Sequence, residues 1–181
     1  INLIGVLQLF SQVNPPIASQ IDAIFQDYEG QPGCAIAIVK DGETIFQRAY
    51  GLANLAYEIP ITTKTIFEVA SNSKQFTAAC IFLLEQEGKL KLDDPIQKYL
   101  PELPSYSNNK ITIQNLLHHT SGLRSYLATL HAKNDYWGNA YDNEDVVKIL
   151  ERHQGLNFPP GTRYAYSNSN YALLATIVSR V

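Results

Sequence analysis

The sequence predicts a mixed fold of the α/β (α+β) class, with an antiparallel sheet and helices, for a chain of 181 residues. Three observations carry this prediction: an apolar helical pattern near the start, two β-prone runs joined by a turn signal, and helical patterns through most of the remainder. A short sheet segment and amphipathic helices both have an apolar face to bury, so they pack on or beside each other. We therefore expect a sheet region followed by a mostly helical region.

The composition is that of a folded protein. Hydrophobic residues make up 45% of the chain, which is too much apolar material for a disordered segment. The formal net charge is -3, so the chain lacks the basic excess typical of proteins that bind nucleic acid or anionic membranes. The apolar run at residues 1–10 is too short to span a bilayer. It is compatible with the remnant of a signal peptide or with a packed N-terminal segment.

The first fifty residues predict one helix and one β-hairpin. From Pro15 onward the apolar residues fall on one helical face: Ile17, Ile21, Ile24, Phe25 and Tyr28. Gly30 is placed to end this helix. The runs 34–39 and 44–50 flank Asp41-Gly42, which is typical of a tight antiparallel turn. An isolated hairpin is marginal in water, so we expect further strands beside it, and an exposed edge that makes the chain prone to aggregation.

The middle of the chain predicts a connecting loop over residues 51–70 and then helices. Helical spacing relates five residues that end before Gly88: Phe76, Ala79, Cys80, Leu83 and Leu84. Asp94-Pro95 opens a short helix toward Tyr99. The two cysteines, Cys34 and Cys80, lie in apolar runs, which predicts two small buried thiols.

The last seventy residues predict three further helices. Thr112 is a candidate N-cap for a short helix that stops at Ser121-Gly122, and Asn143 for a second one with acidic residues in its first turn. Pro159-Pro160-Gly161 predicts a turn. The final helical pattern, over 171–178, reaches the end of the chain without a stop signal.

Ser71 and Lys74 form the sharpest candidate catalytic pair. They are three residues apart where a loop gives way to an apolar helix, so the hydroxyl and the amine lie on one face. A serine hydroxyl becomes a nucleophile when a neighbouring base takes its proton. The spacing itself is common: the same pattern occurs at Ser107 and Lys110 in a polar loop, which we interpret as surface. The alternative for Ser71 and Lys74 is that they only begin a helix.

Tyr166 and Asn168 are a second candidate pair. In an extended segment, residues two apart point the same way, so the phenol and the amide could face one cleft. A phenol beside an ammonium ionises more easily and can relay protons, while an amide can orient a substrate carbonyl. A packed tyrosine and a turn amide explain the same residues without catalysis.

Adjacent histidines at 118 and 119 invite a metal hypothesis. Neighbouring side chains on a helix do not converge, however, and no carboxylate stands at ligand spacing. We interpret both residues as structural.

Several segments in order resemble the serine beta-lactamase and penicillin-binding-protein-like family, and within it the branch of class C beta-lactamases, DD-peptidases and esterases. The resemblance runs from about residue 33 to the end of the chain. The segments that carry it are residues 67–78, 88–95, 111–123 and 160–171. Such a collinear set is far more specific than any single motif.

The resemblance implies a role for each candidate residue. Ser71 would be the acylated nucleophile, Lys74 its base partner, Tyr166 a second acid or base, and Asn168 a contact to the substrate and the lysine. The fold would be beta-lactamase/transpeptidase-like, with no metal or organic cofactor. The implied substrates are beta-lactams, D-amino-acid peptides or esters, and the implied location is periplasmic or secreted. The aromatic stretch around Tyr126, Tyr136, Trp137 and Tyr141 would border the cleft or pack as an ordinary loop.

One part of the family pattern is missing from the chain. The family pattern includes a Lys or His two residues before a Gly, on a strand well after the tyrosine. This chain has that spacing at 40–42 and 153–155, but both matches precede Tyr166. We therefore expect residues 1–70 (helix and hairpin) and residues 71–181 (helical region with the nucleophile) to form an incomplete single catalytic domain, truncated at its C-terminus. The alternative is a truncated or degenerate relative that acts as a binding or structural module.

Overall fold

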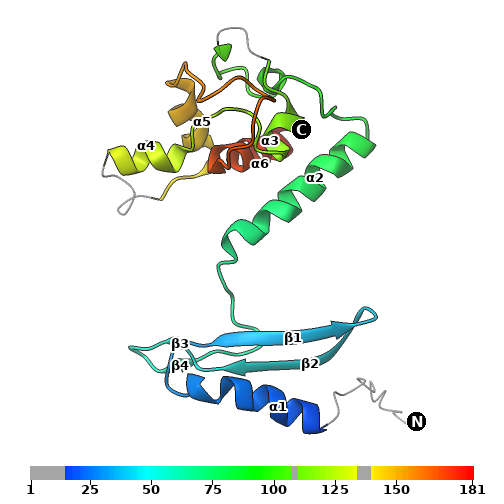
Figure 1. Cartoon of the computed structure of the whole chain (residues 1–181), viewed down its shortest axis with the longest axis vertical. Helices are drawn as coiled ribbons and strands as arrows, with labels where there is room; N and C mark the ends of the chain where they lie inside the picture. Colours follow the sequence, from blue (N-terminus) through cyan, green and yellow to red (C-terminus); the bar gives the residue numbers. More distant parts are fainter. Residues whose placement is uncertain (1–14, 107–109, 134–139) are drawn as a thin grey trace, which may run out of the picture. The chain divides into compact units, whose positions relative to one another are not determined.

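The computed structural model describes residues 15–106, 110–133 and 140–181 (Figure 1). The chain divides into two compact units, Ile1–Glu68 and Val69–Val181. In the described part of the chain, no helix is both long and apolar enough to cross a membrane.

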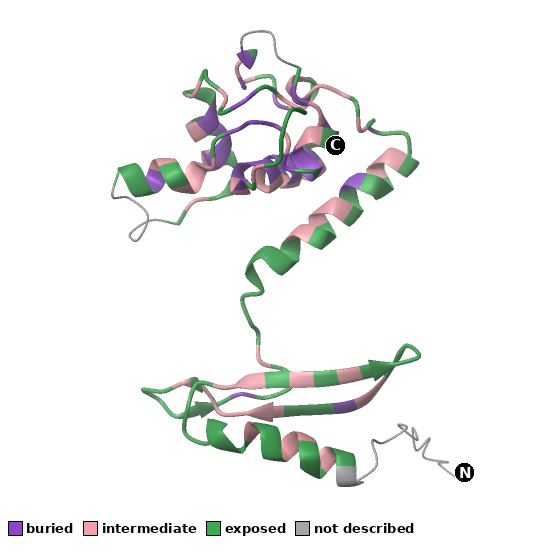
Figure 2. Cartoon of the chain, viewed as in Figure 1, coloured by how far each residue is buried: buried purple, intermediate pink, exposed green. Residues whose placement is uncertain are grey.

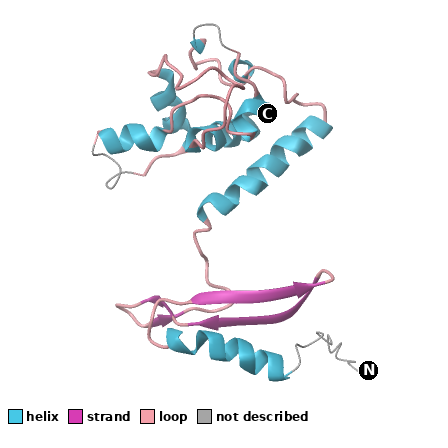
Figure 3. Cartoon of the chain, viewed as in Figure 1, coloured by secondary structure: helices cyan, strands magenta, loops and turns pink. Residues whose placement is uncertain are grey.

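The first unit contains a helix and two small antiparallel sheets (Figure 3). Its elements are α1 (Pro15–Phe25), the 3-10 turn η1 (Gln26–Tyr28), β1 (Cys34–Lys40), β2 (Glu43–Tyr50), β3 (Leu52–Asn54) and β4 (Ile59–Pro60). The predicted hairpin is confirmed: β1 pairs with β2, and Asp41 and Gly42 adopt φ angles of 51° and 83° in the turn. The hairpin has no third strand among the described residues. The loop expected over 51–70 instead contains β3 and β4, which are too short to leave a periodic pattern.

Polar and aromatic contacts fix α1 against the hairpin. Asp22 on α1 pairs with Arg48 and accepts a 2.8 Å hydrogen bond from the Tyr50 hydroxyl. The rings of Phe25 and Tyr50 stack with centroids 4.9 Å apart. Phe46 is the buried side chain of β2, at 9% exposure. The helix predicted from residue 15 therefore contacts the hairpin through Asp22 and Phe25, whereas Ile17 and Ile24 of its predicted apolar face are 48% and 69% exposed.

The second unit is helical and is centred on its last helix. Its elements are the 3-10 turn η2 (Ala70–Ser73), α2 (Lys74–Gln86), the 3-10 turn η3 (Ile96–Lys98), α3 (Ile113–Leu117), α4 (Tyr126–Ala132), α5 (Asn143–Glu151) and α6 (Asn168–Arg180). Helix α6 contacts α2, α3, α4 and α5. Its Leu173, Leu174 and Ile177 are fully buried, and the buried residues gather around it in Figure 2. The candidate site lies at the first residues of this central helix.

Two capping predictions have different outcomes. Thr112 caps α3 as predicted, in a reciprocal capping box with Asn115. The prediction that Asn143 caps α5 is wrong: Asp142 is the N-cap and accepts a 2.8 Å hydrogen bond from the Asp145 amide. The reason is again a capping box, because the Asp145 side chain bonds back to the Asp142 amide.

Helix α2 is apolar on two faces, and four of the five residues that helical spacing relates are exposed, while Leu84 packs against the core. Phe76 and Leu83 are 65% and 58% exposed, whereas Ile81 is fully buried against the core. Helical spacing could not choose between two apolar stripes on one helix. The prediction of two buried thiols is wrong: Cys80 is exposed on α2, and Cys34 at the start of β1 is half-buried.

Helix α4 was not predicted, and one loop tyrosine is buried. The stretch from 126 to 141 was expected to be a loop between helices, but Tyr126–Ala132 is helical. Tyr106, which directly precedes the second Ser-x-x-Lys pattern, is a core residue at 2% exposure. Tyr136, Trp137 and the serine of the second Ser-x-x-Lys pattern, Ser107, lie outside the described residues.

Candidate active site

Ser71 lies in the 3-10 turn η2, immediately before α2. The turn begins at Ala70, whose φ angle of 45° is left-handed. A non-glycine residue in this region stores backbone strain of about 1–3 kcal/mol, and such residues cluster at functional sites. The turn passes directly into α2, where the Lys74 amide donates to the Ser71 carbonyl. The nucleophile candidate is therefore fixed by its backbone on both sides.

Lys74 lies beside Ser71, as the three-residue spacing predicts. Its Nζ is 3.1 Å from Ser71 Oγ and 3.0 Å from Asn168 Oδ1. The first contact is local, but the second joins residues 94 positions apart. Lys74 is thus hydrogen-bonded to the candidate nucleophile and to the amide at the start of α6.

Tyr166 completes the group. Its hydroxyl lies 3.0 Å from Ser71 Oγ and 3.2 Å from Asn168 Oδ1. The hydrogen bond from Lys74, followed by that from Ser71, lowers the pKa of the Tyr166 phenol below its ordinary value of about 10. The Lys74 ammonium also lies 5.3 Å from the centre of the Tyr166 ring, where its charge meets the negative ring face.

The segment that presents Tyr166 and Asn168 is extended for one residue and then helical. Ser167 has extended backbone angles of φ -142° and ψ 124°, and Asn168 is the first residue of α6. The two side chains face the same point, as the two-residue spacing predicts. All four predicted site residues are therefore within one hydrogen-bonded group, which we call the Ser71 quartet: Ser71, Lys74, Tyr166 and Asn168.

His119, which is expected from the sequence to be structural, lies next to the quartet. Its buried ring lies 4.5 Å from the ring of Tyr166. Its Nδ1 accepts hydrogen bonds from the Ser167 amide at 3.2 Å and from the Asn170 side chain at 3.1 Å. Because Nδ1 accepts, it carries no proton in this arrangement. His119 thus holds the segment that presents Tyr166, and this is a structural role at the site.

Buried polar contacts extend this support to the loop after His119. The Ser121 hydroxyl donates to Asn170 Oδ1 at 2.7 Å, and the Ser169 hydroxyl donates to the Arg124 carbonyl at 2.8 Å. Ser121, Ser169 and Asn170 are at most 1% exposed. Buried, satisfied polar groups of this kind rigidify their surroundings. The first turn of α6 is therefore fixed by partners from the 119–124 loop, which sequence periodicity does not reveal.

The protonation of His119 gives a test of this support. Burial, and then the positive charge of Lys74, lower the pKa of His119 below its ordinary value of about 6.5. The unfolded chain therefore binds this proton more readily than the folded chain. The contribution of His119 to stability is present above about pH 6.5 and is lost as the pH falls toward the lowered folded value. Urea unfolding at a series of pH values should show this loss.

The matched pair of histidines makes the test specific. His119→Gln is expected to lower the free energy of unfolding by roughly 1–3 kcal/mol at neutral pH, because buried donors lose their acceptor, and to flatten the acid loss. His118→Gln, at the exposed neighbour, is expected to leave the acid loss unchanged. Equal acid loss in the parent and in His119→Gln would contradict the assignment.

No group of three metal-ligating side chains occurs in the part of the chain that the structure describes. The chemistry that the Ser71 quartet can perform is proton transfer and nucleophilic attack, because it contains a hydroxyl, a phenol, an amine and an amide.

The sequence matches one family over most of its length. The family profile described as Beta-lactamase matches residues 21–181, which include the whole Ser71 quartet. Penicillin-binding protein 4* of Bacillus subtilis (strain 168) is 36% identical over 147 residues, which cover 80% of this chain and 32% of that protein. The chain spans about a third of the length of the curated relatives it matches.

Solved structures agree with the sequence match. The octameric penicillin-binding protein homologue from Pyrococcus abyssi has a TM-score of 0.73 at 27% identity, covering 93% of this chain and 39% of that one. D-amino acid amidase from Ochrobactrum anthropi SV3 has a TM-score of 0.72 at 28% identity, covering 90% of this chain and 44% of that one. The mixed helix and antiparallel-sheet class, and the family resemblance, are confirmed.

Proposed function

The chain belongs to the beta-lactamase family, and we propose that it carries the nucleophile of a serine hydrolase that works through an acyl-enzyme. The single observation that carries the proposal is the Ser71 quartet. Ser71 Oγ has two hydrogen-bond partners, Tyr166 and Lys74, at 3.0 Å and 3.1 Å. A serine with such partners is the arrangement that nucleophilic catalysis requires.

In the proposed first step, Ser71 Oγ attacks the carbonyl carbon of an amide, lactam or ester. The proton of Ser71 passes to Tyr166, whose phenolate form the neighbouring Lys74 ammonium favours. The same proton then goes to the departing nitrogen or oxygen as the bond to the carbonyl carbon breaks. Water attacks the resulting ester of Ser71 in the second step, and the serine regains its proton.

The remaining groups position the reaction. Asn168 holds Lys74 through its Oδ1, and its amide nitrogen is the donor that we assign to a substrate carbonyl. The backbone amide of Ser71 would supply one donor for the negative oxygen that forms in the transition state, a contribution that is usually large. The exposed position of Ser71 gives a substrate access to the nucleophile.

The relatives define the range of substrates to test. Penicillin-binding protein 4* and D-amino acid amidase are named for a beta-lactam and for a D-amino-acid amide. We therefore propose a beta-lactam, a D-amino-acid peptide or amide, or an ester as the substrate of the whole protein, in a periplasmic or secreted location.

Acylation of the purified chain tests the function directly. A fluorescent penicillin, a fluorophosphonate and a D-amino-acid nitroanilide are each incubated with the chain, and its intact mass is followed with time. We expect a covalent adduct with at least one of the three, which peptide mapping places on Ser71. If none labels a folded sample, with or without the downstream sequence, the non-catalytic alternative of a binding or structural module is favoured.

A further inference from the structure

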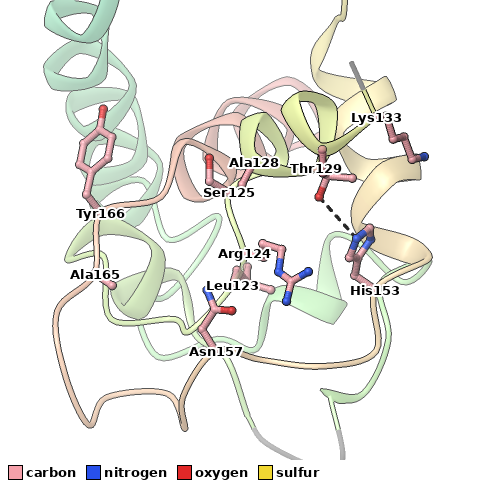
Figure 4. A pocket seen from close by; sticks show the side chains of 11 residues that line it. Leu123, Arg124, Ser125, Ala128, Thr129, Lys133, His153, Asn157, Ala165 and Tyr166 are labelled. Atoms are coloured by element: carbon pink, nitrogen blue, oxygen red, sulfur yellow. Dashed lines mark hydrogen bonds between the residues drawn. The ribbon is translucent and has the colours of Figure 1, made fainter. Parts of the chain in front are cut away.

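A pocket of about 540 Å³ opens beside Tyr166 in the second unit (Figure 4). Its walls come from the segment that leads into α4, from α4 itself and from the stretch between α5 and Tyr166. In Figure 4, Tyr166 and Lys133 lie at opposite ends of the pocket, with Arg124 between them. A ligand in this pocket would therefore be a neighbour of the Ser71 quartet without being part of it.

The charged side chains of the pocket have one sign. Arg124 and Lys133 line it, and among the residues that the structure describes no aspartate or glutamate does. This sign is opposite to that of the whole chain, whose formal net charge is -3. Neither Arg124 nor Lys133 forms an ion pair with any residue that the structure describes. The pocket therefore offers two cationic groups to a ligand.

His153 and Thr129 form an ordered polar wall. His153 Nδ1 donates to the Ile149 carbonyl at 2.8 Å, which leaves Nε2 facing the Thr129 hydroxyl at 3.4 Å (Figure 4). Small apolar side chains, Ala128, Ala132 and Ala165, line the pocket together with Leu123. The lining thus combines a site for negative charge with space for a short aliphatic group.

The backbone of Arg124 is anchored to the same helix as the quartet. Its carbonyl accepts a 2.8 Å hydrogen bond from the Ser169 hydroxyl, and the Ser169 oxygen accepts one of 2.8 Å from the Tyr126 amide. Ser169 directly follows Asn168 in α6. The fixed first turn of α6 therefore positions both the Asn168 side chain of the quartet and the backbone of Arg124. Such pre-organisation is what a binding site needs.

We propose that this pocket binds a carboxylate of the substrate, with Arg124 as its main partner and Lys133 as a second. The planar guanidinium matches the two oxygens of a carboxylate. The inference rests on the proposed function, because that function places the bond to be cleaved at Ser71. It adds a substrate class: amides or esters that carry a carboxylate close to a short aliphatic group, on the side of the molecule next to Tyr166.

Binding to a chain that cannot react separates this proposal from the proposed function. In Ser71→Ala, the affinity for N-acetyl-alanine is compared with that for N-acetyl-alaninamide by NMR titration. We expect the carboxylate to bind about fivefold more tightly than the amide, since an exposed ion pair contributes up to about 1 kcal/mol. The preference should shrink as sodium chloride is added, because salt screens exposed charges.

Charge-matched variants identify the partner. When Arg124→Gln is added to Ser71→Ala, the ratio of the affinity for N-acetyl-alanine to that for N-acetyl-alaninamide should fall close to one. Adding Lys133→Gln instead should lower this ratio in part. Arg152→Gln, an exposed arginine outside this pocket, should keep it. The proposal is overturned if Ser71→Ala shows no preference, if Arg124→Gln retains it, or if inorganic phosphate binds more tightly than N-acetyl-alanine. None of these outcomes depends on acylation of Ser71, so a failure of the proposed function is detected separately.

Discussion

Replacing Ser71 by alanine is expected to abolish covalent labelling of the chain. The variant lacks the oxygen that forms the acyl bond, so no adduct can form at this position. In serine hydrolases the loss of the nucleophile lowers kcat by about 10⁶-fold. The measurement is the rate of adduct formation with the most reactive of the three acylating probes, followed by intact mass.

Ser73 provides a matched control within the same turn. It lies two residues further along η2, is exposed, and its side chain makes no capping hydrogen bond. Ser73→Ala is therefore expected to label at the parent rate. Labelling that survives in Ser71→Ala, or that is lost equally in Ser73→Ala, would contradict the assignment of the nucleophile.

Replacing Lys74 by alanine is expected to slow acylation by up to about 10²–10⁴-fold, the usual contribution of one positioned base, because it removes the group that favours the basic form of Tyr166. The reason lies in Tyr166, whose pKa is lowered first by the hydrogen bond from Lys74. Without the ammonium, this pKa rises toward its ordinary value, and less phenolate is present at neutral pH. The rate that remains should therefore increase with pH over a more alkaline range than in the parent.

Two substitutions make the test of Lys74 specific. Lys91→Ala removes an exposed lysine elsewhere in the second unit and is expected to leave both the rate and the pH profile unchanged. Tyr166→Phe identifies the phenol: the ultraviolet titration signal that shifts in Lys74→Ala should be missing from this variant. If Lys74→Ala acylates like Lys91→Ala, then Ser71 and Lys74 only begin a helix, and the proposed mechanism fails.

Local sequence predicted the parts of the site that depend on neighbours along the chain. Ser71 and Lys74 meet because a turn at the start of a helix brings residues three apart together. Tyr166 and Asn168 face one point because a single extended residue separates them. The hairpin around Asp41-Gly42 and the cap at Thr112 were predictable on the same basis, since each depends on a few consecutive residues.

Long-range packing decided the rest. Helix α2 has two apolar stripes, and only contact with α6 determines that Ile81 is buried while Phe76 is exposed. The support from His119 could not be read from spacing either. Its partners, Ser167 and Asn170, lie about fifty positions away along the chain. The Arg124 pocket is of the same kind, since it combines segments on both sides of α5.

The sequence by itself therefore determined the fold class, the family and the identity of the four quartet residues, because short-range geometry and an ordered set of motifs contain that information. The family resemblance also implied that Asn168 contacts Lys74, but only the tertiary structure decided that Tyr166 reaches Ser71 and that a basic pocket lies beside them. The physical reason is that these contacts join residues up to 95 positions apart. Burial of α6 among four other helices brings them together, and no local pattern in the sequence specifies which buried faces meet.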